Sequence, residues 1–241
     1  MLILISILAV FAGGLIQSAF GFGFVIFSLP IIAFFMPPKV AVPVLLTLAT
    51  FNTLIVALKS FEDIQLKRIW PLIPAGIIGI PLGTLILLRA DSGFIKVLIG
   101  ATILVFVLAL VEFHKPVKKE RAGMAIAGFA SGILQGSVGM SGPPVILYFS
   151  NQEVSKKPFR ANLIFYFLIL NIITLFSYAL AGIYTKQVLS YTAILLPALI
   201  LGTVSGIFLF KKVNEKLFKK LIIVFLIIMA VITIISGLRI I

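Results

Sequence analysis

The sequence predicts an all-α polytopic membrane protein built from two inverted repeats, each a broken, re-entrant helical hairpin followed by three transmembrane helices. Three observations support this fold class. Of the 241 residues, 61% are hydrophobic and 11% are charged, with a mean hydropathy of +1.26, the composition of a chain whose solvent is lipid. Apolar stretches long enough to span a bilayer recur along the chain. Two glycine-rich motifs interrupt these stretches, and they resemble each other.

Six stretches are predicted to be transmembrane helices, because about 20 mainly apolar residues cross a hydrocarbon core of about 30 Å. They are residues 40–59, 70–88 and 94–113 in the first half and residues 160–182, 189–210 and 218–238 in the second half. Residues 2–36 and 122–150 form two further elements, each with a glycine-rich break, so the chain has about eight hydrophobic segments. The first of these lacks a basic start and a cleavage site followed by polar chain. We therefore expect it to be a membrane element rather than a removed signal peptide.

The two glycine-rich breaks are copies of one motif. "FAGGLIQSAFGFG" (residues 11–23) aligns without gaps on "FASGILQGSVGMS" (residues 129–141) at an offset of 118, which superposes Gln17 on Gln135. A matched glutamine between matched glycines indicates that the two elements have the same structure.

The similarity extends beyond the glycine-rich motifs. At an offset of 119 Asn52 falls on Asn171, and at an offset of 123 "PAGIIGIPLG" (74–83) falls on "PALILGTVSG" (197–206). The glycine pairs in these last segments have the small-xxx-small spacing that lets helices pack closely. We infer an internal duplication, with a first repeat at residues 1–116 and a second repeat at residues 117–241.

The distribution of Lys and Arg predicts the direction of the broken elements. The net charge is +13, and the basic residues lie between apolar segments, as in cytoplasmic loops rather than a nucleic-acid-binding surface. If residues 122–150 crossed the membrane, the loops on its two sides would carry 9 and 11 basic residues; if they turn back, the numbers are 15 and 5. Only the second arrangement has a positive-inside bias.

The duplication extends this re-entrant prediction to residues 2–36. Three crossings per repeat then invert the second repeat relative to the first, which is a common architecture of secondary transporters. The expected location is the plasma membrane (the inner membrane in a cell with two), with basic loops in the cytoplasm and both termini outside.

The hairpin tips are the predicted substrate site. Backbone that leaves a helix inside a bilayer survives where it lines a cavity, and the free N–H groups that begin the second half-helix attract anions. Two inverted hairpins would bring their tips together at the midplane. The alternative for each glycine run, and for the asparagines, is close packing between helices. The predicted substrate-binding residues are Gln17, Ser18, Gly21, Gly23, Asn52, Gln135, Ser137, Gly139, Ser141 and Asn171.

The acidic residues argue against cation transport. All seven are expected in loops or at span ends, so none could serve a proton relay or a dehydrated cation in the membrane. They are Glu62, Asp63, Asp91, Glu112, Glu120, Glu153 and Glu215. An anion would therefore be held by neutral donors. Arg160 begins a span beside the second hairpin; a topology charge is its favoured interpretation, and attraction of anions is the alternative.

Other functional classes lack the residues they need. The chain has no cysteine and one histidine, His114, in a polar segment, so no metal site, cofactor or redox role is expected. No nucleophile and base occur together within the spans, which excludes an intramembrane enzyme from the favoured functions.

The glycine motifs and the "MPPKVAV" segment that follows the first of them resemble the sulfite exporter TauE/SafE family of membrane permeases. In that family the first motif is close to G-x-x-x-G-x-G-G-G followed by a hydrophobic stretch and a proline. This chain keeps Gly14, Gly21, Gly23 and Pro30. The resemblance covers nearly the whole chain and implies transport of small sulfur-containing anions such as sulfite or organosulfonates.

These lines of reasoning predict a secondary transporter, acting as an exporter of small sulfur anions by alternating access around a midplane site. A passive small-anion channel and a non-transporting membrane assembly protein are the alternatives. The expected partners are the anion and the lipid bilayer, with no nucleic acid, and a chain this short could form a homodimer.

Overall fold

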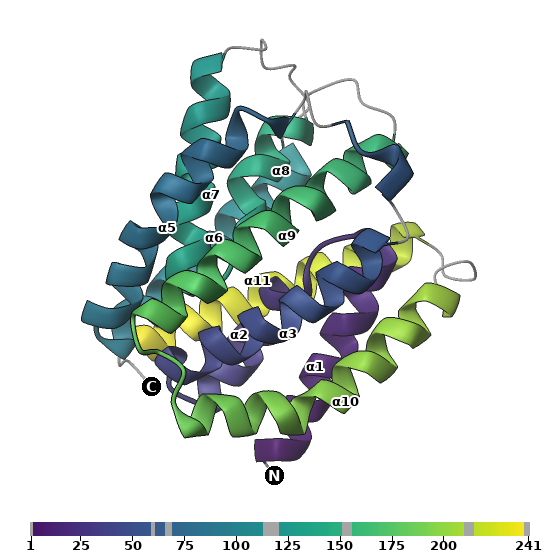
Figure 1. Cartoon of the computed structure of the whole chain (residues 1–241). Helices are drawn as coiled ribbons and strands as arrows, with labels where there is room; N and C mark the ends of the chain where they lie inside the picture. The colour runs from purple at the N-terminus through teal and green to yellow at the C-terminus, as the bar shows by residue number, and fades with distance from the viewer. Residues whose placement is uncertain are drawn as a thin grey trace.

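The structure, a computed structural model, is all-helical (Figure 1). It describes residues 2–58, 61–65, 69–112, 121–150, 156–209 and 215–238. The first half contains α1 (Leu2–Phe20), α2 (Phe24–Phe35), α3 (Pro38–Leu58), the 3₁₀ turn η1 (Phe61–Asp63), α5 (Leu72–Arg89) and α6 (Ser92–Glu112). The second half contains α7 (Arg121–Val138), α8 (Gly142–Ser150), α9 (Lys156–Leu180), α10 (Lys186–Leu209) and α11 (Glu215–Gly237). The six predicted spans correspond to α3, α5, α6, α9, α10 and α11.

The helices have the length and the surface of a membrane protein. Among the described residues, α3, α5, α9 and α10 are long and apolar enough to cross a bilayer, and several shorter apolar helices accompany them. Large apolar side chains point outward: Ile78 on α5 is 65% exposed and Leu201 on α10 is 63% exposed. A surface of this kind would be unstable in water and is stable against lipid. The protein is a multi-pass membrane protein.

Glycine ends the first helix of each broken element. Gly21 and Gly139 have φ angles of +84° and +69°, the left-handed conformation that costs glycine least. The N–H of Gly21 donates to the carbonyl of Gln17 (2.7 Å), and the N–H of Gly139 donates to that of Gln135 (3.0 Å). Both are left-handed caps of a helix C-terminus, so the repeated glycine terminates α1 and α7 in the same way.

After each break the chain folds back along the helix it has just left. In the first element, the Ser28 hydroxyl of α2 donates to the Ala9 carbonyl of α1 (2.9 Å). In the second, a Cβ placed on Gly123 near the start of α7 would lie 3.3 Å from the ring of Tyr148 near the end of α8. Each broken element is therefore a pair of antiparallel helices joined at a glycine-containing tip.

Helices that the predicted duplication pairs with each other run antiparallel. Gly93 near the start of α6 approaches Gly237 at the end of α11, while Gly100 approaches Ala230 further back along α11. Likewise α3 runs against α9, since Val56 and Ala57, which follow Thr53 on α3, pack on Ile164, which precedes Asn171 on α9.

The two halves of the chain pack against each other through several helices rather than forming two separate bundles. Helix α5 of the first half packs on α7 of the second, and α10 of the second packs on α1 of the first (Figure 1). A Cβ on Gly79 would collide with the backbone of α7 at Phe129, and one on Gly202 would collide with the backbone of α1 at Phe11. The small-xxx-small segments are thus packing motifs, as predicted. The predicted repeat boundary at 116/117 and His114 lie outside the described residues.

The acidic residues that the structure describes lie at helix ends or between helices. Glu62, Asp63 and Asp91 are exposed, in η1 and between α5 and α6, while Glu112 ends α6 and Glu215 begins α11. Glu120 and Glu153 lie outside the described residues. The described carboxylates therefore agree with the predicted placement outside the middle of the spans.

Candidate functional site

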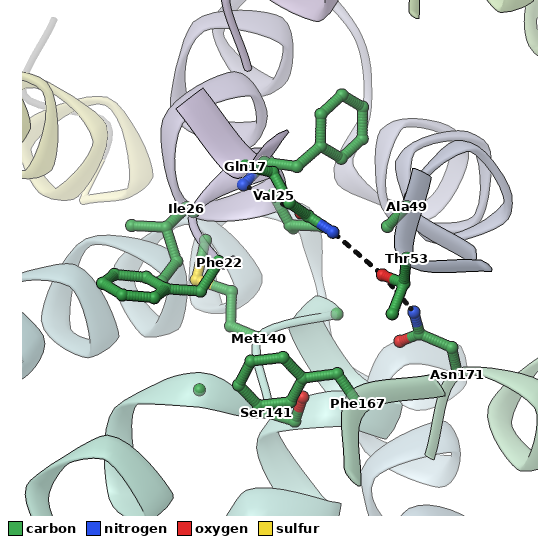
Figure 2. A pocket seen from close by; sticks show the side chains of 14 residues that line it. Gln17, Phe22, Val25, Ile26, Ala49, Thr53, Met140, Ser141, Phe167 and Asn171 are labelled. Carbon is green, nitrogen blue, oxygen red and sulfur yellow. Dashed lines mark hydrogen bonds between the residues drawn. The ribbon is translucent and has the colours of Figure 1, made fainter. Parts of the chain in front are cut away.

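The two hairpin tips meet at one small cavity near the crossing of α3 and α9 (Figure 2). Its volume is about 40 Å³. Since a single water needs roughly 10–15 Å³, this is room for a compact ligand or a few waters. The walls come from both hairpins and from α3 and α9. The lining residues are Gln17, Phe22, Gly23, Phe24, Val25, Ile26, Ala49, Thr53, Gly139, Met140, Ser141, Gly142, Phe167 and Asn171.

The N-termini of two half-helices face this cavity. Helix α2 begins at Phe24, after Gly23 with a φ of +109°, and α8 begins at Gly142. Residues of both first turns, Val25, Ile26 and Gly142, line the wall. The N–H groups of Val25 and Ile26 in the first turn of α2 have no acceptor within their own helix. In α8 the Gly142 N–H is the one donor of this kind, because Pro143 and Pro144 follow it and proline has no N–H. Each helix N-terminus carries a partial positive charge. The cavity therefore has a positive electrostatic character without a charged side chain in its wall.

Gln17 and Gln135 fix the two tips in place. Gln17 Oε1 accepts the Phe24 N–H (3.2 Å), and its Nε2 donates to Thr53 Oγ1 of α3 (2.8 Å). Gln135 Oε1 likewise accepts the Ser141 N–H (3.0 Å), and its Nε2 donates to Asn171 Oδ1 of α9 (2.7 Å). Each glutamine bridges the end of the first helix, the tip and the neighbouring span. Their main role in this conformation is to position the cavity wall.

Thr53, Ser141 and Asn171 supply side-chain donors at the cavity. Thr53 Oγ1 accepts from Gln17 (2.8 Å) and lies 3.5 Å from Asn171 Nδ2 (Figure 2), so its own hydroxyl proton remains available to a ligand. The Ser141 hydroxyl has no hydrogen-bond partner among the described residues, and it lines the wall. Neutral donors of this type can hold an oxyanion without a buried ion pair.

Much of the remaining wall is apolar. The side chains of Phe22, Met140 and Phe167 line the cavity beside the polar groups (Figure 2). Phe22 also packs edge-on against Phe106 of α6, with ring centroids 5.8 Å apart. A few donors set in an apolar wall are the usual composition of a small-ligand site.

The predicted counterpart of Asn171 in the first half is wrong by one residue. Gln17 bonds to residue 53 and Gln135 to residue 171, so the offset of 118 continues into α3 and α9 and makes Thr53 the counterpart of Asn171. Asn52 points elsewhere: its Nδ2 donates to Thr203 Oγ1 of α10 (2.8 Å) and approaches the Gly14 carbonyl of α1 (3.5 Å). Asn52 thus joins three helices. Thr53 is the polar cavity residue that the sequence did not reveal.

The ten predicted substrate-binding residues divide into two groups. Gln17, Gly23, Gly139, Ser141 and Asn171 line the cavity, whereas Ser18, Gly21, Asn52, Gln135 and Ser137 do not. The hydroxyls of Ser18 and Ser137 donate to carbonyls one turn earlier in their own helices, at Gly14 (2.8 Å) and Ile133 (2.7 Å). Gln135 acts on the cavity through Asn171 and Ser141. No three His, Asp or Glu side chains cluster in the part of the chain that the structure describes.

Comparison with known protein families identifies the family of this chain. The family model described as Sulfite exporter TauE/SafE matches residues 6–233, which is nearly the whole sequence. No curated protein and no solved structure matches the chain. The chain belongs to the TauE/SafE family of sulfite exporters; it is a membrane permease and not an enzyme.

Proposed function

We propose that this TauE/SafE permease is a secondary transporter that exports small sulfur oxyanions, and that it binds them in the cavity between the two hairpin tips. The observation that carries the proposal is the meeting of two half-helix N-termini at one cavity. The N–H groups of Val25 and Ile26 in α2, the Gly142 N–H of α8 and the two partial positive charges favour an anion over a cation or a neutral solute.

The size of the cavity favours a compact ligand. With about 40 Å³ available, sulfite is a better match in this conformation than an organosulfonate, whose organic part would need the apolar wall of Phe22 and Phe167 to move. The donors of Thr53, Ser141 and Asn171 surround the space from three elements, which suits an anion with several oxygen atoms.

The antiparallel arrangement of equivalent helices supports inverted repeats and alternating access. Helices α6 and α11 are equivalent in the duplication and run in opposite directions, as do α3 and α9. Two repeats with opposite orientation would give the cavity two related routes, one to each side of the membrane. If residues 122–150 turn back, the loops carry 15 basic residues on one side and 5 on the other, which supports a cytoplasmic location for the more basic side.

Thermal stabilisation by anions tests the site. We expect sulfite to stabilise the detergent-purified protein more than sulfate, phosphate, acetate, sulfoacetate or taurine do. A ligand at about 100 times its Kd stabilises by about 2.7 kcal/mol. Replacing Thr53 by valine keeps the shape of the side chain and removes the hydroxyl, so this stabilisation should fall by about 1–2 kcal/mol.

Thr50→Val is the matched control, because the Thr50 hydroxyl donates to the Leu46 carbonyl one turn back (2.9 Å) and does not line the cavity. Equal stabilisation by every anion, or the same loss in both valine variants, would remove the cavity from consideration as the binding site. Counterflow of labelled sulfite in proteoliposomes distinguishes a transporter from a passive channel, because only a transporter shows trans-stimulation.

A further inference from the structure

Arg160 lies on the face of α9 that leads to the cavity. Arg160, Phe167 and Asn171 are spaced by seven and four residues, which places them along one face of a helix. At 1.5 Å per residue, Arg160 precedes Phe167 by about 10 Å along the axis. Phe167 and Asn171 line the cavity, so the path along this face of α9 from Arg160 is one that an anion could follow to the donors.

The side chain of Arg160 folds onto the tip of the first hairpin. Its Nη2 donates to the Ser18 carbonyl in the last turn of α1 (2.7 Å). A Cβ on Gly21 would lie 2.7 Å from Arg160 Cγ, so the arginine covers the backbone two residues before the cavity-lining Gly23. This contact joins the start of α9 in the second half to the end of α1 in the first half.

The guanidinium has fewer acceptors than it can use. Nε is buried and has no hydrogen-bond partner among the residues that the structure describes. Among the same residues, the Ser18 carbonyl is the one acceptor that Arg160 contacts. A guanidinium carries five N–H donors in a fork that matches an oxyanion, and a buried donor without an acceptor is unfavourable. An arriving anion would supply the missing acceptors.

The equivalent position in the first half holds an apolar residue. The offset of 118 relates Arg160 to Val42, which is fully buried and approaches the equivalent glycine, since a Cβ on Gly139 would lie 3.8 Å from Val42 Cγ1. Each tip is therefore covered by a residue from the equivalent place in the other half. A topology charge explains why an arginine lies near the cytoplasm, but it does not explain why that arginine is folded against a tip.

We propose that Arg160 is a specificity-determining residue that selects anions at the cytoplasmic mouth of the path, and that Val42 makes the opposite mouth apolar. The proposal rests on the proposed function. An oxyanion entering from the cytoplasm replaces the Ser18 carbonyl as the hydrogen-bond acceptor of the guanidinium. It then passes Phe167 to reach Thr53 and Asn171. The asymmetry makes capture stronger on the cytoplasmic side, as an exporter requires.

Labelled-sulfite uptake into oriented vesicles tests this assignment with the full-length chain. Everted vesicles present the cytoplasmic face to the medium, and right-side-out vesicles present the external face. We expect Arg160→Gln to raise KM about tenfold in everted vesicles, with the external KM and the maximal rate within about twofold of wild type. Arg160→Lys keeps the charge but loses the fork, so its cytoplasmic KM should rise only about threefold.

Arg89→Gln is the matched control: it removes the same charge from an exposed helix end and should leave both KM values unchanged. Unchanged kinetics in Arg160→Gln beside an active wild type would overturn the Arg160 assignment alone. An equal rise of KM on both faces, without rescue by lysine, would also overturn it and make Arg160 a structural contact between α9 and α1. Absence of saturable uptake by the wild type would instead reject the proposed function, and the Arg160 assignment with it. If Arg160→Gln does not migrate as a folded protein in size-exclusion chromatography, Arg160→Lys decides by the same two KM values.

Discussion

Gln135→Ala is expected to destabilise the protein by about 3 kcal/mol or more and to abolish sulfite transport. The Gln135 side chain is completely buried and satisfies the Ser141 N–H and Asn171 Oδ1. Alanine leaves both groups without a partner, at a cost of about 1–3 kcal/mol each, and adds an empty space where the amide was. Thermal unfolding of the purified variant and counterflow in proteoliposomes measure the two effects.

The control for this experiment lies two residues away. The Ser137 hydroxyl is also buried but donates only to the Ile133 carbonyl one turn earlier, so Ser137→Ala should cost about 0.5–1 kcal/mol and leave transport intact. If Gln135→Ala and Ser137→Ala unfolded at the same temperature, the glutamine would not be positioning the second tip.

The two glutamines can also be tested against each other. Their partners are in contact, since Asn171 Nδ2 lies 3.5 Å from Thr53 Oγ1, so Gln17 and Gln135 belong to one network that joins both halves. Residues in one network give coupling energies of about 0.5–3 kcal/mol in a double-mutant cycle. The Gln17→Ala/Gln135→Ala variant should therefore lose less stability than the sum of the single losses.

Local patterns in the sequence were sufficient to predict the helices and the breaks. A glycine that needs a left-handed φ, as at Gly21 and Gly139, and an apolar stretch of about 20 residues are properties of a few neighbouring residues. The matched glutamines lie beside the two tips in the structure, where they accept the Phe24 and Ser141 N–H groups, and substrate binding by them stays a prediction. These features depend little on which helix packs against which.

Thr53 could not be identified in this way because a threonine in a span usually bonds to its own helix. Thr47, Thr50 and Thr174 all donate to the carbonyl four residues earlier, and the sequence around Thr53 does not differ from theirs in kind. Only the approach of Gln17 from α1 distinguishes it. Asn52 was predicted instead because an offset of 119 matches it with Asn171, yet it lies on the face of α3 that meets α10.

The helices that the packing glycines contact could not be predicted from the sequence either. The spacing of Gly79 and Gly83 predicts close helix packing, but it does not say that α5 packs on a helix from the other half. The contact of Arg160 could not be predicted either. Its position between apolar segments fits a topology charge, and its hydrogen bond to Ser18 depends on the packing of α9 from the second half against α1 from the first.

Gly132→Ala should destabilise the protein by about 2 kcal/mol, because α5 and α7 touch backbone to backbone at this point. A Cβ on Gly132 would collide with the Gly76 carbonyl oxygen and would lie 2.8 Å from its carbonyl carbon. Main-chain atoms cannot rotate away as a side chain can, so the two helices must separate. Overpacking of this kind costs about 1–3 kcal/mol, and the intrinsic helix preference of alanine offsets up to about 1 kcal/mol of it. Thermal unfolding in detergent measures the change.

Gly123→Ala on the same helix separates packing from helix propensity. The nearest atom to a Cβ there belongs to the ring of Tyr148, at 3.3 Å, and a ring can shift by the few tenths of an ångström that are needed. This variant should be as stable as the wild type or slightly more so. Gly202→Ala should behave like Gly132→Ala, since its Cβ would collide with the Phe11 carbonyl of α1. Equal stability of all three variants would mean that the contact between the halves tolerates an added methyl group, and that close backbone approach does not hold the exchanged helices together.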